Sequence, residues 1–229
     1  MRFDNRTVIV TGGTGALGTA VVGALLADGA HCLVPYRRDT DADNFPHKDR
    51  VTLVSRCDLT DEADVSRLYG GVTDLWASIH LAGGFAMGDL SDTDKTSLMQ
   101  MLNMNFVSCY LCCRAALGAF GPTGGRIANV ASRPALEPRT GSGITAYTAT
   151  KSAVGALTQA LAAQVAGRNI LVNAIAPSII DTPANRAAMP KADHAAWPTP
   201  EEIGAAIAFL ASPENMVTSG AIVPVCGRA

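Results

Sequence analysis

The chain alternates short apolar runs rich in β-branched residues with longer segments of helical periodicity. Seven runs are strand candidates: "TVIVTG" at residues 7–12, followed by "HCLVP", "VTLVSRCD", "ASIHLAG", "RIANVAS", "ILVNAIAP" and "AIVPV". Continuous apolar runs of this length are typical of strands that are buried on both faces. Parallel strands cannot be joined by tight hairpins, so this rhythm predicts an α/β fold with a doubly wound parallel sheet of about seven strands, flanked by helices.

The clearest helices are predicted at residues 94–120, 147–165 and 200–211, and another follows the first strand and ends at Gly29. The helix at 200–211 begins with "TPEE", in which Thr199 can cap the helix and Glu202 can complete a capping box. No linker rich in Gly, Pro or Ser divides the 229 residues, so a single domain over residues 1–229 is expected. The irregular segment 181–198 suits a short flap over a site, and its composition fits an ordinary surface loop equally well.

Composition excludes several classes of partner. A net charge of -2 gives no excess of positive charge for binding a nucleic-acid backbone. No apolar run approaches the roughly 20 residues needed to cross a bilayer, and the N-terminus has no signal-peptide core. The expected location is therefore cytoplasmic, with no nucleic-acid or membrane partner.

The cysteines lie mostly inside apolar segments and lack the paired spacings typical of zinc sites. They are expected to be small, reduced core residues. The histidines show no carboxylate or cysteine pattern, so none is assigned to catalysis and no metal site is predicted. The residues concerned are Cys32, Cys57, Cys109, Cys112, Cys113 and Cys226, and His31, His47, His80 and His194.

A glycine-rich turn follows the first strand. The stretch "VTGGTGALG" satisfies GxGxxG from Gly13 to Gly18, directly between a strand and a helix. Glycines let the backbone approach a pyrophosphate closely, and the helix N-terminus offers unpaired amides to the anion. The turn favours dinucleotide binding on a Rossmann-type sheet, and a tight loop that only packs the helix is the alternative.

The end of the second strand bears on which nicotinamide cofactor is used. A carboxylate there would bind both ribose hydroxyls of NAD(H), whereas arginine suits the 2′-phosphate of NADP(H). Arg37 and Arg38 occupy this place, which favours NADP(H) over NAD(H). Asp39, Asp41 and Asp43 follow closely and keep the NAD(H) alternative open.

Tyr147 and Lys151 stand four residues apart in "AYTATKSA". On a helix both side chains leave the same face. A cation about 4 Å from a phenol contributes roughly 4 kcal/mol at an effective dielectric constant near 20, equivalent to about three pKa units before screening. The pair is thus a candidate for proton transfer, although such pairs are also common as surface residues.

Together these motifs resemble the classical short-chain dehydrogenases/reductases, over nearly the whole chain. The matching stretches are "TGGTGALG", "CDL", "LAGG", "MNF", "NVAS", "YTATK" and "VNAIAPSIIDTP". The resemblance implies an NAD(P)(H)-dependent oxidoreductase that reduces a carbonyl to an alcohol by hydride transfer. It implies that Tyr147 is the general acid and base, and that Lys151 lowers the phenol pKa and holds the nicotinamide ribose. Ser132 would bind the substrate oxygen, and Asn105 would support a proton path behind the lysine.

The same resemblance implies a set of cofactor contacts from the glycine turn, the ends of the next strands and the segment after residue 176. These are Gly12, Gly13, Thr14, Gly15, Ala16, Leu17 and Gly18; Arg37 and Arg38; Asp58 and Leu59; Ala82, Gly83 and Gly84; Tyr147 and Lys151; and Pro177, Ile180 and Thr182.

The chain departs from the family pattern in several places. The segment between Ser132 and Tyr147 is longer than usual, so Ser132 is the least secure of the assigned residues. Ala16 replaces a frequent glycine, Ser178 replaces a glycine after Pro177, and the "VCGRA" ending is unusual. His80 stands where the family usually has asparagine.

Two kinds of alternative remain open at this level. The substrate could be a bicyclic pterin, as in dihydropteridine reductases, or a 3-oxoacyl thioester. A protein that binds NADP(H) as a sensor without turnover is the alternative from another functional class. Family members commonly pair through the helices that correspond to 94–120 and 147–165, which implies a homo-oligomer, either a dimer or a homotetramer.

Overall fold

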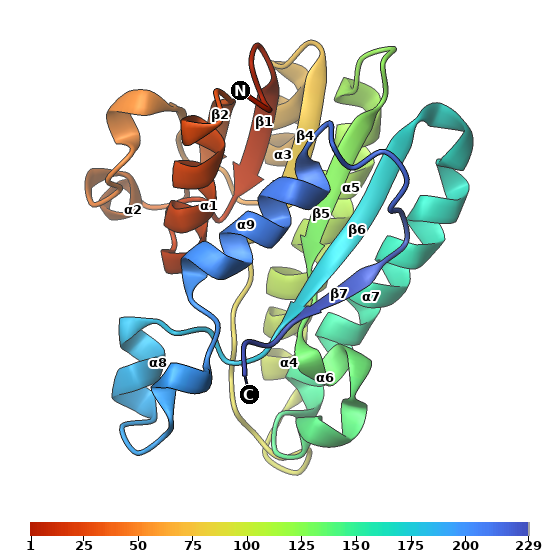
Figure 1. The fold of residues 1–229 in the computed structure, drawn as a ribbon. Coiled ribbons are helices and arrows are strands. Elements are labelled where there is room, and N and C mark those ends of the chain that lie inside the picture. The colour runs from red at the N-terminus through yellow and green to blue at the C-terminus, as the bar shows by residue number, and fades with distance from the viewer. Residues whose placement is uncertain (229) are drawn as a thin grey trace.

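The computed structural model describes residues 1–228. Seven strands form one sheet in the order β3-β2-β1-β4-β5-β6-β7, and every pairing is parallel. The predicted doubly wound sheet is therefore confirmed (Figure 1). The strands are β1 (Thr7–Thr11), β2 (His31–Pro35), β3 (Thr52–Val54), β4 (Leu75–His80), β5 (Gly125–Val130), β6 (Ile170–Pro177) and β7 (Ile222–Val225).

Helices cover both faces of the sheet, and none of the described ones is both long and apolar enough to span a bilayer. They are α1 (Ala16–Ala27), α2 (Asp39–Asp43), α3 (Glu62–Gly70), α4 (Lys95–Leu102), α5 (Ser108–Ala119), α6 (Arg133–Leu136), α7 (Thr145–Gln164), α8 (Pro183–Ala188) and α9 (Pro200–Ala211). The capping box predicted at the start of α9 is present between Thr199 and Glu202.

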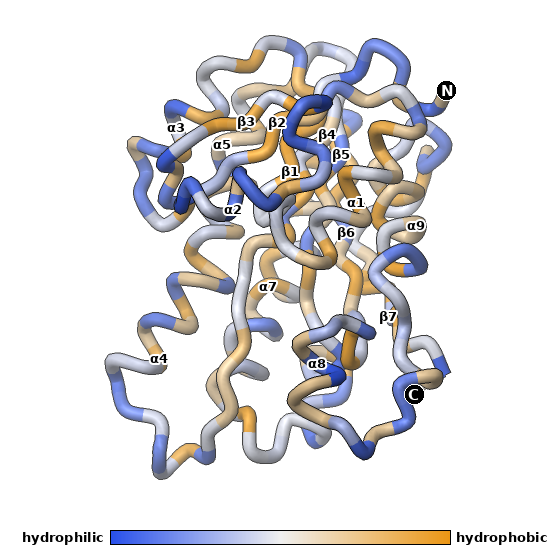
Figure 2. The backbone as a smooth tube through the Cα atoms, turned by 90° about the vertical axis from the view of Figure 1, so that its left-hand side faces the viewer, coloured by the Kyte–Doolittle hydropathy of each residue, from blue (hydrophilic) through white to orange (hydrophobic). Residues whose placement is uncertain are grey.

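Two apolar cores lie on opposite faces of the sheet, because successive side chains of a strand point to opposite sides. Val8 and Val10 of β1 pack with α1 and α9 on one face. Ile9, between them, packs on the other face with α3, α5 and α7. Hydrophobic segments accordingly concentrate in the interior of the molecule, and the outer loops are mostly hydrophilic (Figure 2).

The predicted helix at 94–120 is continuous but not uniform. It begins after the N-cap Asp94, whose side chain accepts a hydrogen bond from the Ser97 amide, and it ends at Ala119. Between α4 and α5 the residues Asn103–Val107 form a π-helical turn. Such a turn inserts an extra residue into the helix, and here it contains Asn105.

The segment between Ser132 and Tyr147 folds into two short helical pieces, α6 and the 3₁₀ turn Pro138–Gly141, before α7 begins at Thr145. Residues 181–198 contain α8 and the 3₁₀ turn His194–Ala196, and they lie beside the carboxyl end of the chain (Figure 1). Both segments border the edge of the sheet at which the parallel strands end.

Candidate active site

The glycine turn joins β1 to α1 in a conformation that two of its glycines require. Gly12 has a φ of +68°, in the left-handed region that favours glycine. A Cβ added to Gly18 would collide with the carbonyl oxygen of Gly12 and with the backbone of Gly13. The N-cap Gly15 provides no side-chain cap, and the first turn of α1 carries no acidic residue. The amides at this helix N-terminus are therefore free to bind an anion.

A cleft of about 490 Å³ opens over this turn. Its walls come from the turn, from the segments after β2 and β3, and from the segment after β4. Twelve of the sequence-predicted cofactor residues line it: Gly12, Thr14, Gly15, Ala16, Leu17, Gly18, Arg37, Arg38, Asp58, Leu59, Ala82 and Gly83. Its size and its glycine-lined floor fit a dinucleotide.

The other predicted cofactor residues lie outside the walls of this cleft. Gly13 packs against Val34, and Gly84 exchanges hydrogen bonds with Asn105. Three more lie at the end of β6 and in the segment that leads to α8. Pro177 is the last residue of β6, Ile180 follows it, and Thr182 caps α8. Sequence reasoning missed Tyr36, Thr60, Met104 and Ser108, which also line the cleft, and it named Asp41 only as one of the carboxylates that keep the NAD(H) alternative open. Of the missed residues, Tyr36 stands next to the arginine pair and could have been found from the sequence.

The two arginines of the cleft are both paired with carboxylates. Arg38 donates two hydrogen bonds to Asp41, at 2.8 and 3.2 Å, and these hold the pKa of that carboxyl below its usual value. Arg37 lies 3.6 Å from Asp58. The pKa of Asp58 is also lowered, mainly by hydrogen bonds from the Thr60 amide and hydroxyl. Both arginine side chains are about three-quarters exposed, so they remain accessible to a ligand phosphate.

Asn105 is held against the loop that follows β4. Its side-chain nitrogen donates to the Gly84 carbonyl at 3.0 Å, and its oxygen accepts from the Gly84 amide at 2.9 Å. A Cβ added to Gly83 would lie 2.7 Å from the Asn105 oxygen and 3.4 Å from the Lys151 nitrogen. The loop, Asn105 and Lys151 therefore meet at one point, which only a glycine at 83 allows.

Lys151 is buried on α7, and its ammonium donates to the Val130 carbonyl at 2.9 Å. Burial lowers the pKa of Lys151 to about 8, because the charged form loses its hydration. This places its titration within reach of the physiological range.

Tyr147 stands one turn before Lys151 on α7, and the ring of Phe85 packs edge-on against it with 5.0 Å between ring centroids. The pKa of Tyr147 is raised from its ordinary value, because burial disfavours the phenolate more than the nearby Ser132 hydroxyl favours it. The expected lowering of this pKa by Lys151 is not among the causes of the shift, and the Lys151 ammonium donates to the Val130 carbonyl instead.

Ser132 follows β5, and its hydroxyl lies beside Tyr147. Its Oγ is buried and makes no hydrogen bond within residues 1–228. A buried hydroxyl without a partner costs free energy unless a ligand satisfies it, so this atom fits contact with a substrate oxygen. The longer segment before Tyr147 has not moved Ser132 away from the phenol.

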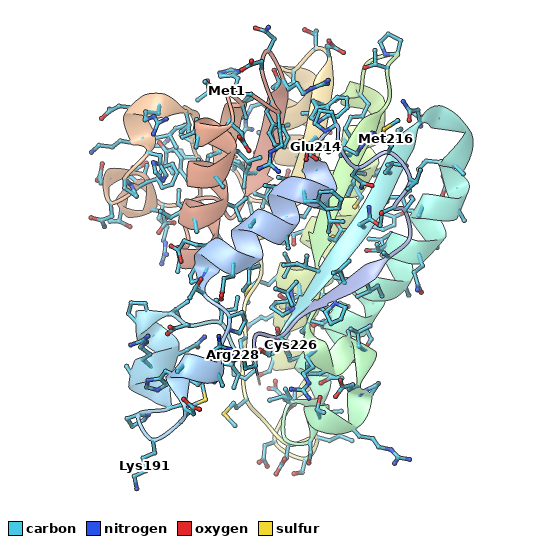
Figure 3. All side chains as sticks on the ribbon, viewed as in Figure 1. Met1, Lys191, Glu214, Met216, Cys226 and Arg228 are labelled. Carbon is cyan, nitrogen blue, oxygen red and sulfur yellow. The ribbon has the colours of Figure 1, made fainter. Side chains whose placement is uncertain are left out.

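A second cavity, of about 400 Å³, lies within the segment 181–198 and the end of the chain. Arg228 borders it beside α8 (Figure 3). Asp181 and Arg186 form an ion pair on its wall, and Trp197 and Glu202 line it as well. Sequence analysis predicted the segment but not this cavity.

The sequence and the fold match known proteins over nearly the whole chain. The sequence profile of the short chain dehydrogenase family matches residues 6–193, so this chain belongs to that family. Galactitol 2-dehydrogenase of Rhizobium johnstonii is 32% identical over 253 residues, covering 98% of this chain and 95% of that protein. Meso-2,3-butanediol dehydrogenase of Serratia marcescens is 29% identical over 250 residues, covering 100% and 96%.

A solved structure of a blue fluorescent protein from a metagenomic library, in complex with NADPH, has the same fold. It superposes with a TM-score of 0.86 at 27% identity and covers 99% of this chain and 98% of its own. The family, the dehydrogenase relatives and the dinucleotide cleft together identify the chain as an NAD(P)-dependent oxidoreductase.

Proposed function

We propose that the chain reduces a carbonyl to an alcohol, with Tyr147 donating the proton to the carbonyl oxygen. The observation that carries this proposal is the Ser132 hydroxyl, which is buried, has no hydrogen-bond partner among residues 1–228 and lies beside the Tyr147 phenol. A substrate oxygen between the two hydroxyls would give Ser132 a partner and bring the phenol proton within reach. The nicotinamide, when bound, supplies the hydride.

Of the remaining assigned residues, Lys151 serves cofactor binding and Asn105 fixes the wall of the cleft. Lys151 lies one turn from Tyr147 on α7, where its ammonium suits the ribose hydroxyls of the cofactor. Asn105 fixes the loop of Gly83 and Gly84 through its two hydrogen bonds. This keeps the wall of the cofactor cleft in place and joins it to the elements that carry Lys151.

NADP(H) is the preferred cofactor in this proposal. Arg37 and Arg38 border the cleft with exposed guanidinium groups, and a 2′-phosphate would take over the role of Asp41 as the anionic partner of Arg38. For NAD(H) the same Asp41 would be the carboxylate nearest the ribose. The NADPH named with the metagenomic blue fluorescent protein supports the first arrangement.

Three of the cofactor residues outside the cleft, Pro177, Ile180 and Thr182, belong in the proposal to the nicotinamide end of the cofactor. They lie between the last residue of β6 and the N-cap of α8, on the segment that leads into the proposed substrate flap at 181–198. The substrate class follows from the relatives. Galactitol and meso-2,3-butanediol, named for two of them, are both alcohols, so ketones and hydroxyketones are the first candidates.

We place the protein in the cytoplasm as a homo-oligomer, a dimer or a homotetramer, formed by the single domain 1–229. Support comes from apolar side chains of the α4–α5 segment that are 39–45% exposed in the single chain, namely Leu98, Met99, Met104 and Tyr110. Light scattering coupled to gel filtration measures the subunit count, and a monomer at micromolar concentration would contradict this part.

The central test is Tyr147→Phe, with Tyr110→Phe as the matched control on an exposed tyrosine. NADPH oxidation is followed with a panel of ketones, hydroxyketones, aldehydes, acyl thioesters and pterins. We expect Tyr147→Phe to lower kcat by about 10²-fold or more, because the proton donor is lost, and to leave NADPH affinity nearly unchanged. Turnover at the parental rate in Tyr147→Phe would refute the mechanism. Preference for pterins or thioesters would reassign the substrate.

A further inference from the structure

A buried cluster of sulfur and nitrogen atoms lies between the sheet and α5. His80 ends β4, and Asn129 stands directly opposite it in the register of β5. Cys109 and Cys113 lie one turn apart on α5, so both thiols face the same way, toward the sheet. All four side chains are at most 5% exposed.

The atoms of this cluster are spaced like the donors of a tetrahedral metal site. The Nδ1 of His80 lies 3.5 Å from the Cys113 sulfur and 4.0 Å from the Cys109 sulfur. With Zn–S near 2.3 Å and Zn–N near 2.0 Å, a tetrahedral zinc site separates sulfur from nitrogen by roughly 3.5 Å. The Asn129 oxygen lies 3.4 Å from the Cys109 sulfur and 3.6 Å from the Cys113 sulfur, which is a similar separation. It lies 2.8 Å from Nδ1 of His80, a hydrogen bond that must open for both atoms to bind one ion.

Further hydrogen bonds hold two of these side chains from behind. The Nε2 of His80 lies 2.7 Å from the Ser78 hydroxyl and 3.3 Å from the Tyr69 hydroxyl. The Nδ1 of His80 lies 2.8 Å from the Asn129 oxygen, which can only accept a hydrogen bond, so Nδ1 carries the proton in the metal-free chain. Metal binding requires this proton to move to Nε2, where the Ser78 hydroxyl can accept it, and then leaves the Nδ1 electron pair for the ion, as in a metal-bound histidine. The Asn129 amide donates to Thr158 at 2.9 Å, which turns its oxygen toward the cluster.

We propose that His80, Cys109 and Cys113 bind a structural Zn²⁺ ion, with the Asn129 oxygen as the fourth ligand. Two thiols lose their protons as two Zn–S bonds form, so one ion replaces two protons and the buried site stays neutral. Four protein ligands leave no open position for substrate, which makes the role structural. This revises the sequence-based expectation of no metal site. It does not depend on the proposed carbonyl reduction.

The test uses the full chain, produced with added Co²⁺ or Zn²⁺ and washed with a chelator. We expect one retained ion per chain, and for Co²⁺ the thiolate-to-metal charge-transfer absorption together with the visible bands of tetrahedral cobalt. Cys109→Ser and Cys113→Ser should lose the charge-transfer band. Cys112→Ser is the matched control, because that buried thiol is adjacent on α5 but lies outside the cluster, beside Tyr69. It should keep the ion and the band.

His80→Asn separates loss of the metal from misfolding, because the family usually has asparagine at this position and the variant should therefore fold. This variant should fold by circular dichroism, keep NADPH affinity and lose the retained ion. The proposal is overturned if the parent chain retains no metal, if bound cobalt shows no thiolate band, or if folded Cys109→Ser, Cys113→Ser and His80→Asn retain metal as the parent does. Loss of metal in Cys112→Ser alone would also overturn it.

Discussion

Gly18→Ala tests the shape of the dinucleotide turn most directly. In a helix, alanine is favoured over glycine by about 1 kcal/mol. At Gly18 the added methyl group would overlap the Gly12 carbonyl and the Gly13 backbone, which cannot rotate away as a side chain would. Overpacking of this kind costs about 1–3 kcal/mol. The overpacking cost therefore cancels or exceeds the gain in helix propensity. To relieve the overlap, the turn must shift outward into the space of the pyrophosphate.

We expect Gly18→Ala to weaken NADPH binding by about tenfold or more, which corresponds to about 1.4 kcal/mol, and to gain no stability. NADPH affinity is measured by fluorescence titration and the free energy of unfolding by urea denaturation. Gly118→Ala on α5 is the control, because no described residue outside its own stretch of helix lies within 4 Å of its added methyl group. It should keep NADPH affinity and gain up to about 1 kcal/mol of stability. Parental NADPH affinity in Gly18→Ala would refute the account of the turn.

Three further outcomes are expected. Arg38→Ala should reduce the ratio of NADPH to NADH affinity by about tenfold through loss of a phosphate contact, and an unchanged ratio in paired titrations would remove Arg38 from cofactor choice. Because burial lowers the pKa of Lys151 to about 8 from 10.5, the unfolded chain binds more protons between these values. The free energy of unfolding, relative to Lys151→Met, should therefore rise with pH across that window in urea denaturation, and a fall would contradict the burial. Thr199→Ala removes the acceptor of the Glu202 amide and should cost about 1 kcal/mol of stability, whereas no change would mean that the cap is dispensable.

Sequence patterns predicted the sheet well because they report directly on burial. β2 and β6 have the bounds of their apolar runs, and α9 begins and ends where its cap and periodicity indicate. Local patterns could not predict the π-helical turn at Asn103–Val107. The turn contains Asn105, which forms hydrogen bonds with Gly84, and these two residues are 21 positions apart in the sequence.

The site was predicted in part for the same reason. All predicted residues of the glycine turn except Gly13 line the cleft as expected, because one local segment forms that wall. The raised pKa of Tyr147 could not be predicted, since it depends on burial by distant segments such as the one carrying Phe85. The cluster of His80 with Cys109 and Cys113 was missed as well. Its helical spacing is visible in the sequence, but the histidine joins it only through the order of the strands.

The π-helical turn links the active-site loop to the inner face of α5. One residue of an α-helix accounts for about 100° of rotation. Deleting a single residue from Asn103–Val107 would turn the rest of the helix by that angle and swing Cys109 and Cys113 away from β4 and β5. The orientations of Asn105, which supports the cleft wall, and of the Cys109 and Cys113 thiols therefore depend on the same turn of helix. An insertion or deletion at this point would alter both at once, so we expect the length of this turn to be fixed among functional variants of the chain.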